Sequence, residues 1–128
     1  MKNKIHSYSV QENDFPNFFG SDIHEVCSTY TLCREAEKLG RMFILPFVDE
    51  HNEGIGTFVD IQHLGPAFLH EEILFEGRIV NEDKKNFVIK FVAKVGKRTI
   101  AEGRTGQKLV NRKKMSAIFL RLKKTVEK

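Results

Sequence analysis

The amino-acid sequence predicts an α+β fold in which one long helix packs on an antiparallel β-sheet. Apolar residues recur at every third or fourth position over residues 28–47, which is the spacing of an amphipathic helix. From residue 54 to residue 110 apolar and polar residues mostly alternate, which is the spacing of half-buried strands. Short turns separate these strand segments, so we expect consecutive strands to pair as an antiparallel meander with the helix on one face.

The first 22 residues are expected to contribute little to the sheet. Residues 1–13 place Ile5 and Val10 among polar neighbours and predict one short, peripheral strand. Residues 13–22 combine turn residues with Phe15, Phe18 and Phe19, and so predict a loop. This loop could cover a pocket, but we expect its phenylalanines to fill the edge of the core.

The long helix is predicted to begin near Ser28 and to end at Pro46, which cannot continue a helix. Its apolar stripe is the set Leu32, Ala36, Leu39, Phe43 and Phe47. Gly40 lies within this helix, at a cost of about 1 kcal/mol relative to alanine. We therefore expect another element to pack closely against the helix at Gly40.

The strand that follows, residues 54–64, carries a candidate site residue. A period of two places Ile55, Thr57, Val59, Ile61 and His63 on one face. His63 thus ends the apolar face of the strand, immediately before the turn residues Gly65 and Pro66. A single histidine at a strand end is more often structural than catalytic, so this pattern alone does not establish a site.

Three more strands are predicted near residues 71–80, 87–95 and 98–110. The last one presents Ala101, Gly103 and Thr105 on one face, and such small side chains let a helix lie close to the sheet. Because one helix can hardly cover a sheet of this size, we expect a second copy of the chain to complete the burial, and hence a homodimer.

The length and composition of the chain indicate one domain spanning residues 1–128. Its 41% hydrophobic residues, including eleven phenylalanines, are enough to form one core. Cys27 and Cys33 are too few for a disulfide framework and are expected to be reduced. The five histidines show no metal-ligand spacing, so no metal site is expected. No apolar run is long enough to span a bilayer and no secretory signal follows the N-terminus, so we expect a soluble, cytoplasmic protein.

The last segment, residues 111–124, predicts a basic amphipathic helix. Met115, Ile118, Phe119 and Leu122 share one helical face and basic residues surround them. Such a helix can bind a membrane, a nucleic acid or the phosphates of coenzyme A. More often it packs on its own domain, which is our expectation here, with neither nucleic-acid binding nor stable membrane association.

Two segments of the chain resemble one family of enzymes. They are the run Val26-Cys27-Ser28-Thr29-Tyr30-Thr31-Leu32 at the helix entrance, followed by Glu37, and the run Gly54-Ile55-Gly56-Thr57-Phe58-Val59-Asp60-Ile61-Gln62-His63-Leu64-Gly65-Pro66. Both look like the fluoroacetyl-CoA thioesterase-like group of the hotdog-fold thioesterase superfamily. The resemblance extends from about residue 5 to about residue 115 and implies a hotdog fold.

The resemblance also implies the residues of the site. Matched position by position, the catalytic threonine, glutamate and histidine of the family correspond to Thr29, Glu37 and His63, and Gly56 and Phe58 are expected to contact substrate. The chain departs from the family at Phe58, a position that is often polar, and over residues 104–107. Those residues read Arg104-Thr105-Gly106-Gln107, where the family tends to have a histidine and an arginine.

The expected activity is hydrolysis of a small or medium acyl-CoA, with coenzyme A as part of the substrate and no cofactor. A hydroxyl, an imidazole and a carboxylate supply the nucleophile, the base and the orienting group that this reaction needs. Eight helical residues, however, separate Thr29 from Glu37 by about 12 Å along the axis. Either Thr29 lies in a loop that folds back, or the site is assembled across a dimer. The alternative is an acyl-CoA-binding protein without hydrolytic activity, if residues 104–107 disable the site.

Overall fold

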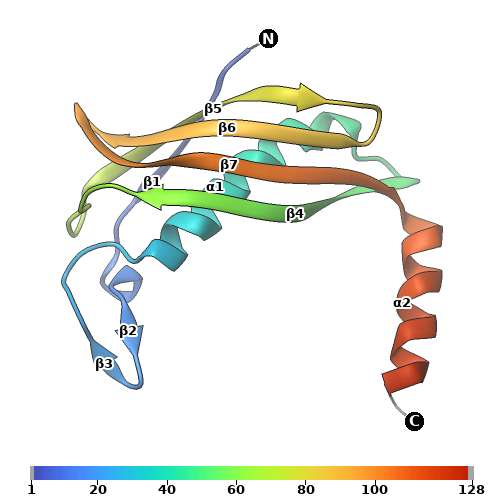
Figure 1. The fold of residues 1–128 in the computed structure, drawn as a ribbon, viewed down its shortest axis with the longest axis horizontal. Coiled ribbons are helices and arrows are strands. Elements are labelled where there is room, and N and C mark those ends of the chain that lie inside the picture. Colours follow the sequence, from blue (N-terminus) through green and yellow to red (C-terminus); the bar gives the residue numbers. More distant parts are fainter. Residues whose placement is uncertain (1, 127–128) are drawn as a thin grey trace.

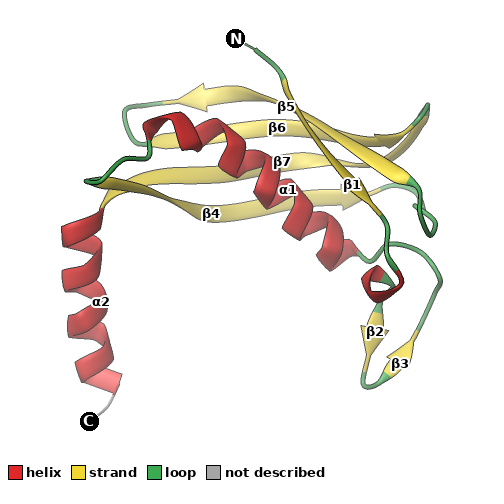
Figure 2. Ribbon diagram, turned by 180° about the vertical axis from the view of Figure 1, so that it is seen from behind, coloured by secondary structure: helices red, strands yellow, loops and turns green. Residues whose placement is uncertain are grey.

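The computed structural model describes residues 2–126 and consists of a curved five-stranded sheet with one long helix across its concave side (Figures 1 and 2). The order of the sheet is β1-β5-β6-β7-β4, and each neighbouring pair is antiparallel. The strands of this sheet are β1 (Lys4–Ser9), β4 (Asn52–His63), β5 (Glu72–Glu82), β6 (Asn86–Val95) and β7 (Arg98–Asn111). The predicted α+β arrangement is therefore confirmed, and β1 and β4 form the two edges. The expected pairing of consecutive strands holds for β5, β6 and β7 but is wrong for β4, which pairs with β7 and not with β5 because the chain crosses over from one edge of the sheet to β5.

Helix α1 (Thr29–Ile44) crosses the sheet and buries the predicted apolar stripe against it. Leu32, Ala36 and Leu39 are fully buried, together with Ile73, Phe75, Phe91 and Ile100 of the sheet. The helix ends at Ile44 and a short 3₁₀ turn, η2 (Leu45–Phe47), continues it. Phe47, which the periodicity places on the buried stripe, instead lies half exposed and stacks on Phe87.

Gly40 confirms that an element packs closely on the helix. A Cβ at this position would lie 2.9 Å from Cγ2 of Thr105 and 3.1 Å from Nε2 of Gln107, both on β7. Thr105 and Gln107 are buried. The small residue is therefore required where α1 lies directly on the centre of the sheet.

Strand β4 contains a β-bulge that the alternation of its residues did not predict. Gly56 pairs with Gln107 and Phe58 pairs with Gly106, so Thr57 is the extra residue in the ladder. The bulge inverts the alternation of side chains between the two faces of the sheet. Val59, Ile61 and His63 lie on the α1 side as predicted, opposite Thr105, Gly103 and Ala101, whereas Ile55 and Thr57 do not share that face.

The segment before α1 forms a small projection instead of filling the edge of the core. A 3₁₀ turn, η1 (Glu12–Asp14), leads into a two-stranded hairpin of β2 (Asn17–Phe18) and β3 (Ser21–Asp22). Phe15 is buried as expected, but Phe18 and Phe19 are exposed. The prediction that the phenylalanines fill the core edge is therefore wrong for Phe18 and Phe19, because the hairpin carries them away from the sheet (Figure 1).

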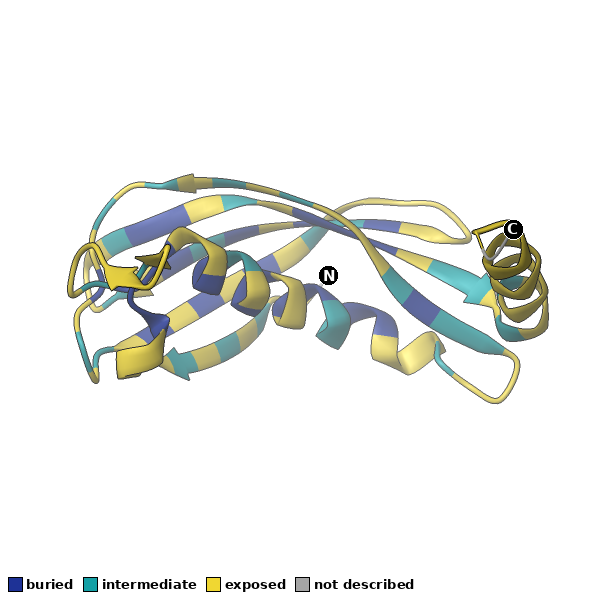
Figure 3. Ribbon diagram, turned by 90° about the horizontal axis from the view of Figure 1, so that it is seen from below, coloured by how far each residue is buried: buried dark blue, intermediate teal, exposed yellow. Residues whose placement is uncertain are grey.

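The C-terminal helix α2 (Arg112–Val126) forms as predicted, but its expected packing is wrong. None of its residues is buried, and it leaves the sheet at the end of β7 and projects beyond β4 (Figures 1 and 3). Within residues 2–126, no helix is long and apolar enough to cross a membrane.

Candidate active site

Thr29 and His63 meet at one end of the sheet. Thr29 is the first residue of α1 and His63 is the last residue of β4. Their side chains are joined by a hydrogen bond of 2.8 Å between Oγ1 of Thr29 and Nδ1 of His63. The structure thus brings together two side chains that are 34 positions apart in the chain and that the sequence analysis assigned to one site.

Backbone pairing just before α1 explains this meeting. The N–H of Cys27 donates to the carbonyl of Ala67 at 2.8 Å, and Val26 forms a β-bridge with Phe68. Ala67 and Phe68 belong to the loop that follows His63. The two segments are therefore fastened side by side, and the start of the helix lies next to the end of the strand.

The cap of α1 leaves the hydroxyl of Thr29 available. Ser28, Thr29 and Thr31 are all suitable N-cap residues by type, but Ser28 occupies the N-cap. Its Oγ accepts from the N–H of Thr31 and donates to Oγ1 of Thr31, and both groups are buried. Thr29 is consequently inside the first turn, where its exposed side chain reaches His63 instead of capping the helix.

The same helix end offers donors for a negatively charged oxygen. The N–H groups of Thr29 and Tyr30, the first two residues of the helix, have no acceptor inside it by helix geometry. The helix dipole also favours negative charge at this end. A hydroxyl, an imidazole and unpaired backbone donors thus occur together, which are the parts that acyl transfer needs.

Glu37 lies apart from this pair within the single chain. Its carboxylate covers Gly56 of β4, where a Cβ would lie 2.8 Å from Oε2 of Glu37. Because Thr29 and Glu37 both belong to one regular helix, the alternative in which Thr29 folds back in a loop is wrong. The side chain of Glu37 is exposed, on the side of α1 that faces the open edge of β4.

The two residues expected to contact substrate lie on different faces. Gly56 is exposed beside Glu37. The ring of Phe58 covers Gly106, which faces away from α1 because its neighbours Thr105 and Gln107 face towards it. Phe58 is therefore on the outer face of the sheet, and neither residue adjoins the Thr29–His63 pair within one chain.

The segment that departs from the family, residues 104–107, belongs to the middle of β7. Thr105 donates a hydrogen bond to the carbonyl of Phe58, and Thr105 and Gln107 pack on α1. In the register of the sheet Thr105 lies opposite Val59, four residues before His63. Thr105 and Gln107 therefore contribute to helix packing, and within one chain the segment leaves the Thr29–His63 pair intact.

A buried charged cluster behind the helix start was not found from the sequence. Asp14 is buried, its carboxylate accepts from the hydroxyl of Tyr8 and the N–H of Gln11, and its carbonyl accepts from the N–H of Ser28. Burial and the carboxylate of Asp14 raise the pKa of Tyr8 to about 12. Asp14 thus holds the N-cap residue in place, and no local periodicity signals such a contact.

Glu35 forms the other half of this cluster. It is fully buried and meets Nε2 of His6 at 2.8 Å, Nε of Arg34 at 2.7 Å and Nζ of Lys38 at 3.0 Å. Burial alone would raise the pKa of Glu35, but the hydrogen bonds from Arg34, His6 and Lys38 outweigh it and lower the pKa. The carboxylate is therefore charged and fixes α1 to β1.

The two cysteines are poor candidates for the nucleophile. Burial raises the pKa of the Cys27 thiol to about 12 and also raises that of Cys33. Both are free thiols, and thiols of raised pKa react slowly. Among residues 2–126, no three His, Cys, Asp or Glu side chains are arranged to hold a metal ion.

Comparisons with known proteins agree with this geometry. Residues 10–113 match the sequence profile of the FlK family, described as fluoroacetyl-CoA-specific thioesterase. A Thermus thermophilus protein described as a thioesterase superfamily member superimposes with a TM-score of 0.92 at 28% identity, covering 98% of this chain and 93% of that one. No curated protein sequence matches the chain.

Two more solved structures share the fold at lower identity. The fluoroacetyl-CoA thioesterase FlK superimposes with a TM-score of 0.84 at 13% identity, covering 94% of this chain and 93% of that one. A hot-dog-like protein from Thermanaerovibrio acidaminovorans has a TM-score of 0.81 at 14% identity, with 94% and 89% covered. The predicted hotdog fold is confirmed.

Proposed function

The chain belongs to the fluoroacetyl-CoA-specific thioesterase family, and on this basis we propose that it hydrolyses the thioester of a small or medium acyl-CoA to the free acid and coenzyme A. The observation that carries the proposal is the 2.8 Å hydrogen bond between Thr29 and His63 at the start of α1. Water is the second reactant, and coenzyme A enters only as part of the substrate.

In the proposed reaction His63 acts as the base. It takes the proton of the Thr29 hydroxyl, or of a water that this hydroxyl orients, as the oxygen attacks the carbonyl carbon of the thioester. The carbonyl oxygen becomes negatively charged next to the N–H groups of Thr29 and Tyr30, where the helix dipole stabilises it. The carbon–sulfur bond then breaks and His63 returns the proton to the leaving sulfur. If Thr29 attacks directly, water then hydrolyses the acyl ester by the same steps.

The role proposed for Glu37 requires a second chain. The carboxylate of Glu37 lies over Gly56, near the start of the open edge strand β4. If two β4 strands pair antiparallel about a twofold axis, the first half of one strand lies beside the second half of the other. We propose that this homodimer brings Glu37 and Gly56 of one copy to the His63 end of its partner. There the carboxylate would orient the imidazole or position water.

One experiment tests the activity directly. The purified protein and its His63→Ala variant are assayed for release of free thiol from short, branched, aromatic and long acyl-CoAs. We expect one substrate class to be hydrolysed by the parent protein and not measurably by the variant. If the parent hydrolyses none of them, or the variant keeps the parent rate, the proposal is wrong.

The alternative, an acyl-CoA-binding protein without hydrolysis, has less support. It depended on residues 104–107 disabling the site, and Thr105 and Gln107 of this segment instead pack on α1, away from the His63 of the same chain. Binding of acyl-CoA without thiol release in the same assay would favour this alternative.

A further inference from the structure

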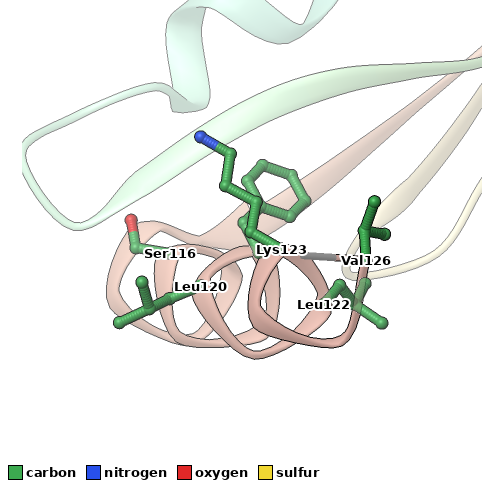
Figure 4. Close-up of a pocket in the computed structure, with 6 residues that line it drawn as sticks. Ser116, Leu120, Leu122, Lys123 and Val126 are labelled. Atoms are coloured by element: carbon green, nitrogen blue, oxygen red, sulfur yellow. The ribbon is translucent and has the colours of Figure 1, made fainter. Parts of the chain in front are cut away.

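Helix α2 presents an apolar surface that residues 2–126 leave largely exposed. Five large apolar side chains of this helix are exposed, namely Ile118, Phe119, Leu120, Leu122 and Val126. Figure 4 shows Leu120 on one side of the helix and Leu122 and Val126 on the other, with Lys123 between them. Because α2 begins at residue 112 and the family profile ends at residue 113, its role does not follow from family membership.

The charge of α2 narrows the choice of partner. Residues 112–126 contain six basic side chains and no acidic one, namely Arg112, Lys113, Lys114, Arg121, Lys123 and Lys124. A groove between α2 and the sheet is also both basic and apolar. Its lining includes Lys85 and Lys108 together with Ile55, Met115 and Phe119. The complementary partner is therefore both apolar and acidic.

The position of α2 connects it to the open edge of the sheet. Asn111, the residue before α2, pairs with Asn52, the first residue of β4. From this point α2 projects past β4, on the side where the sheet has no further strand (Figures 1 and 2). A second copy that pairs antiparallel along β4 would place its His63 end beside the start of this helix.

The His63 end of the chain has the complementary character. Leu64 and Phe68, in the loop that follows β4, are 56% and 47% exposed. Phe68 also lines a surface depression together with the apolar residues Phe15 and Leu69 and the acidic residues Glu12, Asp22 and Glu25. Exposed leucine and phenylalanine side chains bordered by carboxylates match the apolar and basic surface of α2.

We propose that α2 docks on the His63 end of a second copy of this chain, so that each subunit reaches across the β4 edge to the catalytic end of the other. This inference rests on the homodimer in the proposed function. A twofold axis makes both contacts at once, since each copy carries one helix and one acidic, apolar end. This arrangement covers the exposed apolar side chains of α2 and places the lysines of α2 beside the Thr29–His63 pair of the partner.

The first test measures the dimer. Sedimentation velocity gives the dissociation constant of the parent, of Leu122→Asp on α2 and of Leu74→Asp on β5. Leu74 is an exposed leucine remote from the β4 edge, so Leu74→Asp is the matched control. We expect Leu122→Asp to weaken the dimer at least roughly tenfold and the control to leave it unchanged. Since Leu122 is not buried, its substitution does not disturb the fold of one chain.

Three results would overturn the proposal. They are a parent protein that stays monomeric, a Leu122→Asp variant with the parent dissociation constant, and an anionic phosphatidylserine vesicle that binds the parent through Leu122 while the dimer is unaffected. All three are read from mass or vesicle binding and not from turnover. A failure here is therefore distinct from a failure to find an acyl-CoA substrate.

The second test locates the contact. A chain with Cys33→Ser, Leu64→Cys and Ser116→Cys is treated with a short bismaleimide. Within one chain these positions lie at opposite ends of β4, whose twelve residues span about 40 Å, so a short linker can join them only between two chains. We expect a covalent dimer from the double-cysteine chain and none from either single-cysteine chain. Equal cross-linking of a Leu74→Cys and Ser116→Cys chain would overturn the assignment.

Discussion

At the scale of single residues, the assignment of Ser28 as the N-cap decides what Thr29 can do. A threonine that caps a helix commits its oxygen to a backbone N–H. Here Ser28 accepts from the N–H of Thr31, so the hydroxyl of Thr29 is left to His63. The first prediction therefore concerns these two side chains as one unit.

We expect His63→Ala to lower acyl-CoA turnover by about 100-fold or more, because an acid–base residue typically contributes at least that factor. Thr29→Ala should also impair turnover, and the double variant should lose little more than the worse single variant, since the two groups act together. Circular dichroism spectra that match that of the parent protein are the control for correct folding of the variants. Losses that multiply in the double variant would show that the two residues act independently.

Glu35 supports a second prediction, on stability and pH. Its buried carboxylate is paired with His6, Arg34 and Lys38, of which Arg34 and Lys38 are half exposed. Glu35→Gln removes the negative charge that pairs with these basic side chains, and we expect it to lower the free energy of unfolding by about 2 kcal/mol at neutral pH. Urea unfolding followed by circular dichroism measures the difference, with the exposed Glu72→Gln as control.

The pH dependence of this difference follows from the lowered pKa of Glu35. A carboxyl group with a lower pKa in the folded than in the unfolded state stabilises the fold above the unfolded pKa, which is near 4.5, and loses this contribution as pH falls towards the folded pKa. The gap between the parent and Glu35→Gln should therefore narrow below about pH 4.5. A gap that stays constant down to pH 3 would contradict this sign.

At the scale of elements, the contact between α1 and β7 explains the glycine inside the helix. Alanine in place of an exposed helical glycine gains about 1 kcal/mol. At Gly40 the added Cβ would lie 2.9 Å from Cγ2 of Thr105, a short branched side chain inside the core that has little freedom to move. The steric cost is expected to exceed the gain in helix propensity.

The third prediction is that Gly40→Ala lowers the free energy of unfolding by about 1 kcal/mol. In a Thr105→Ser chain, which lacks the Cγ2 methyl group, the same substitution should cost less or become favourable. A double-mutant cycle of unfolding free energies measures this coupling. If Gly40→Ala stabilises the parent chain by the full helix propensity, the close contact does not limit this position.

At the scale of the whole molecule, two features call for a second copy. Strand β4 is an edge strand of twelve residues that pairs with β7 on one side and has no neighbouring strand on its other side within residues 2–126, and Glu37 lies beside that open edge instead of beside His63. Pairing of two β4 strands would satisfy the open edge and bring Glu37 of one copy close to His63 of the other. The fourth prediction is therefore that the protein sediments as a dimer, with twice the mass of one chain.

Because dissociation would expose the β4 edge and α2 together, the melting temperature should rise with protein concentration. Scanning calorimetry over a wide range of concentrations measures this dependence. A melting temperature that is independent of concentration, combined with the mass of one chain, would exclude the dimer and the roles given to Glu37 and α2.

The sequence by itself determined the two helices and the five strands of the main sheet, in their order along the chain, but not the hairpin of β2 and β3 or the position of β4 next to β7. The helical spacing of Leu32, Ala36 and Leu39 and the alternation in β5, β6 and β7 are local patterns, and local geometry alone makes one face apolar. The sequence also predicted a close contact at Gly40, because a glycine inside a helix lowers its stability and is expected only where another element packs against it. Matching to a known family then placed Thr29, Glu37 and His63 among the candidates.

Only the tertiary structure decided which of these residues meet. Thr29 reaches His63 because Cys27 pairs with Ala67, a contact between segments 40 positions apart that no periodicity records. The bulge at Thr57 follows from the ladder with β7, and the buried cluster of Asp14 and Glu35 joins three separate segments. The position of α2 also depends on contacts that are distant in the sequence. Its local sequence specifies a helix with apolar and basic side chains, but the direction in which β7 ends decides whether another surface covers this helix.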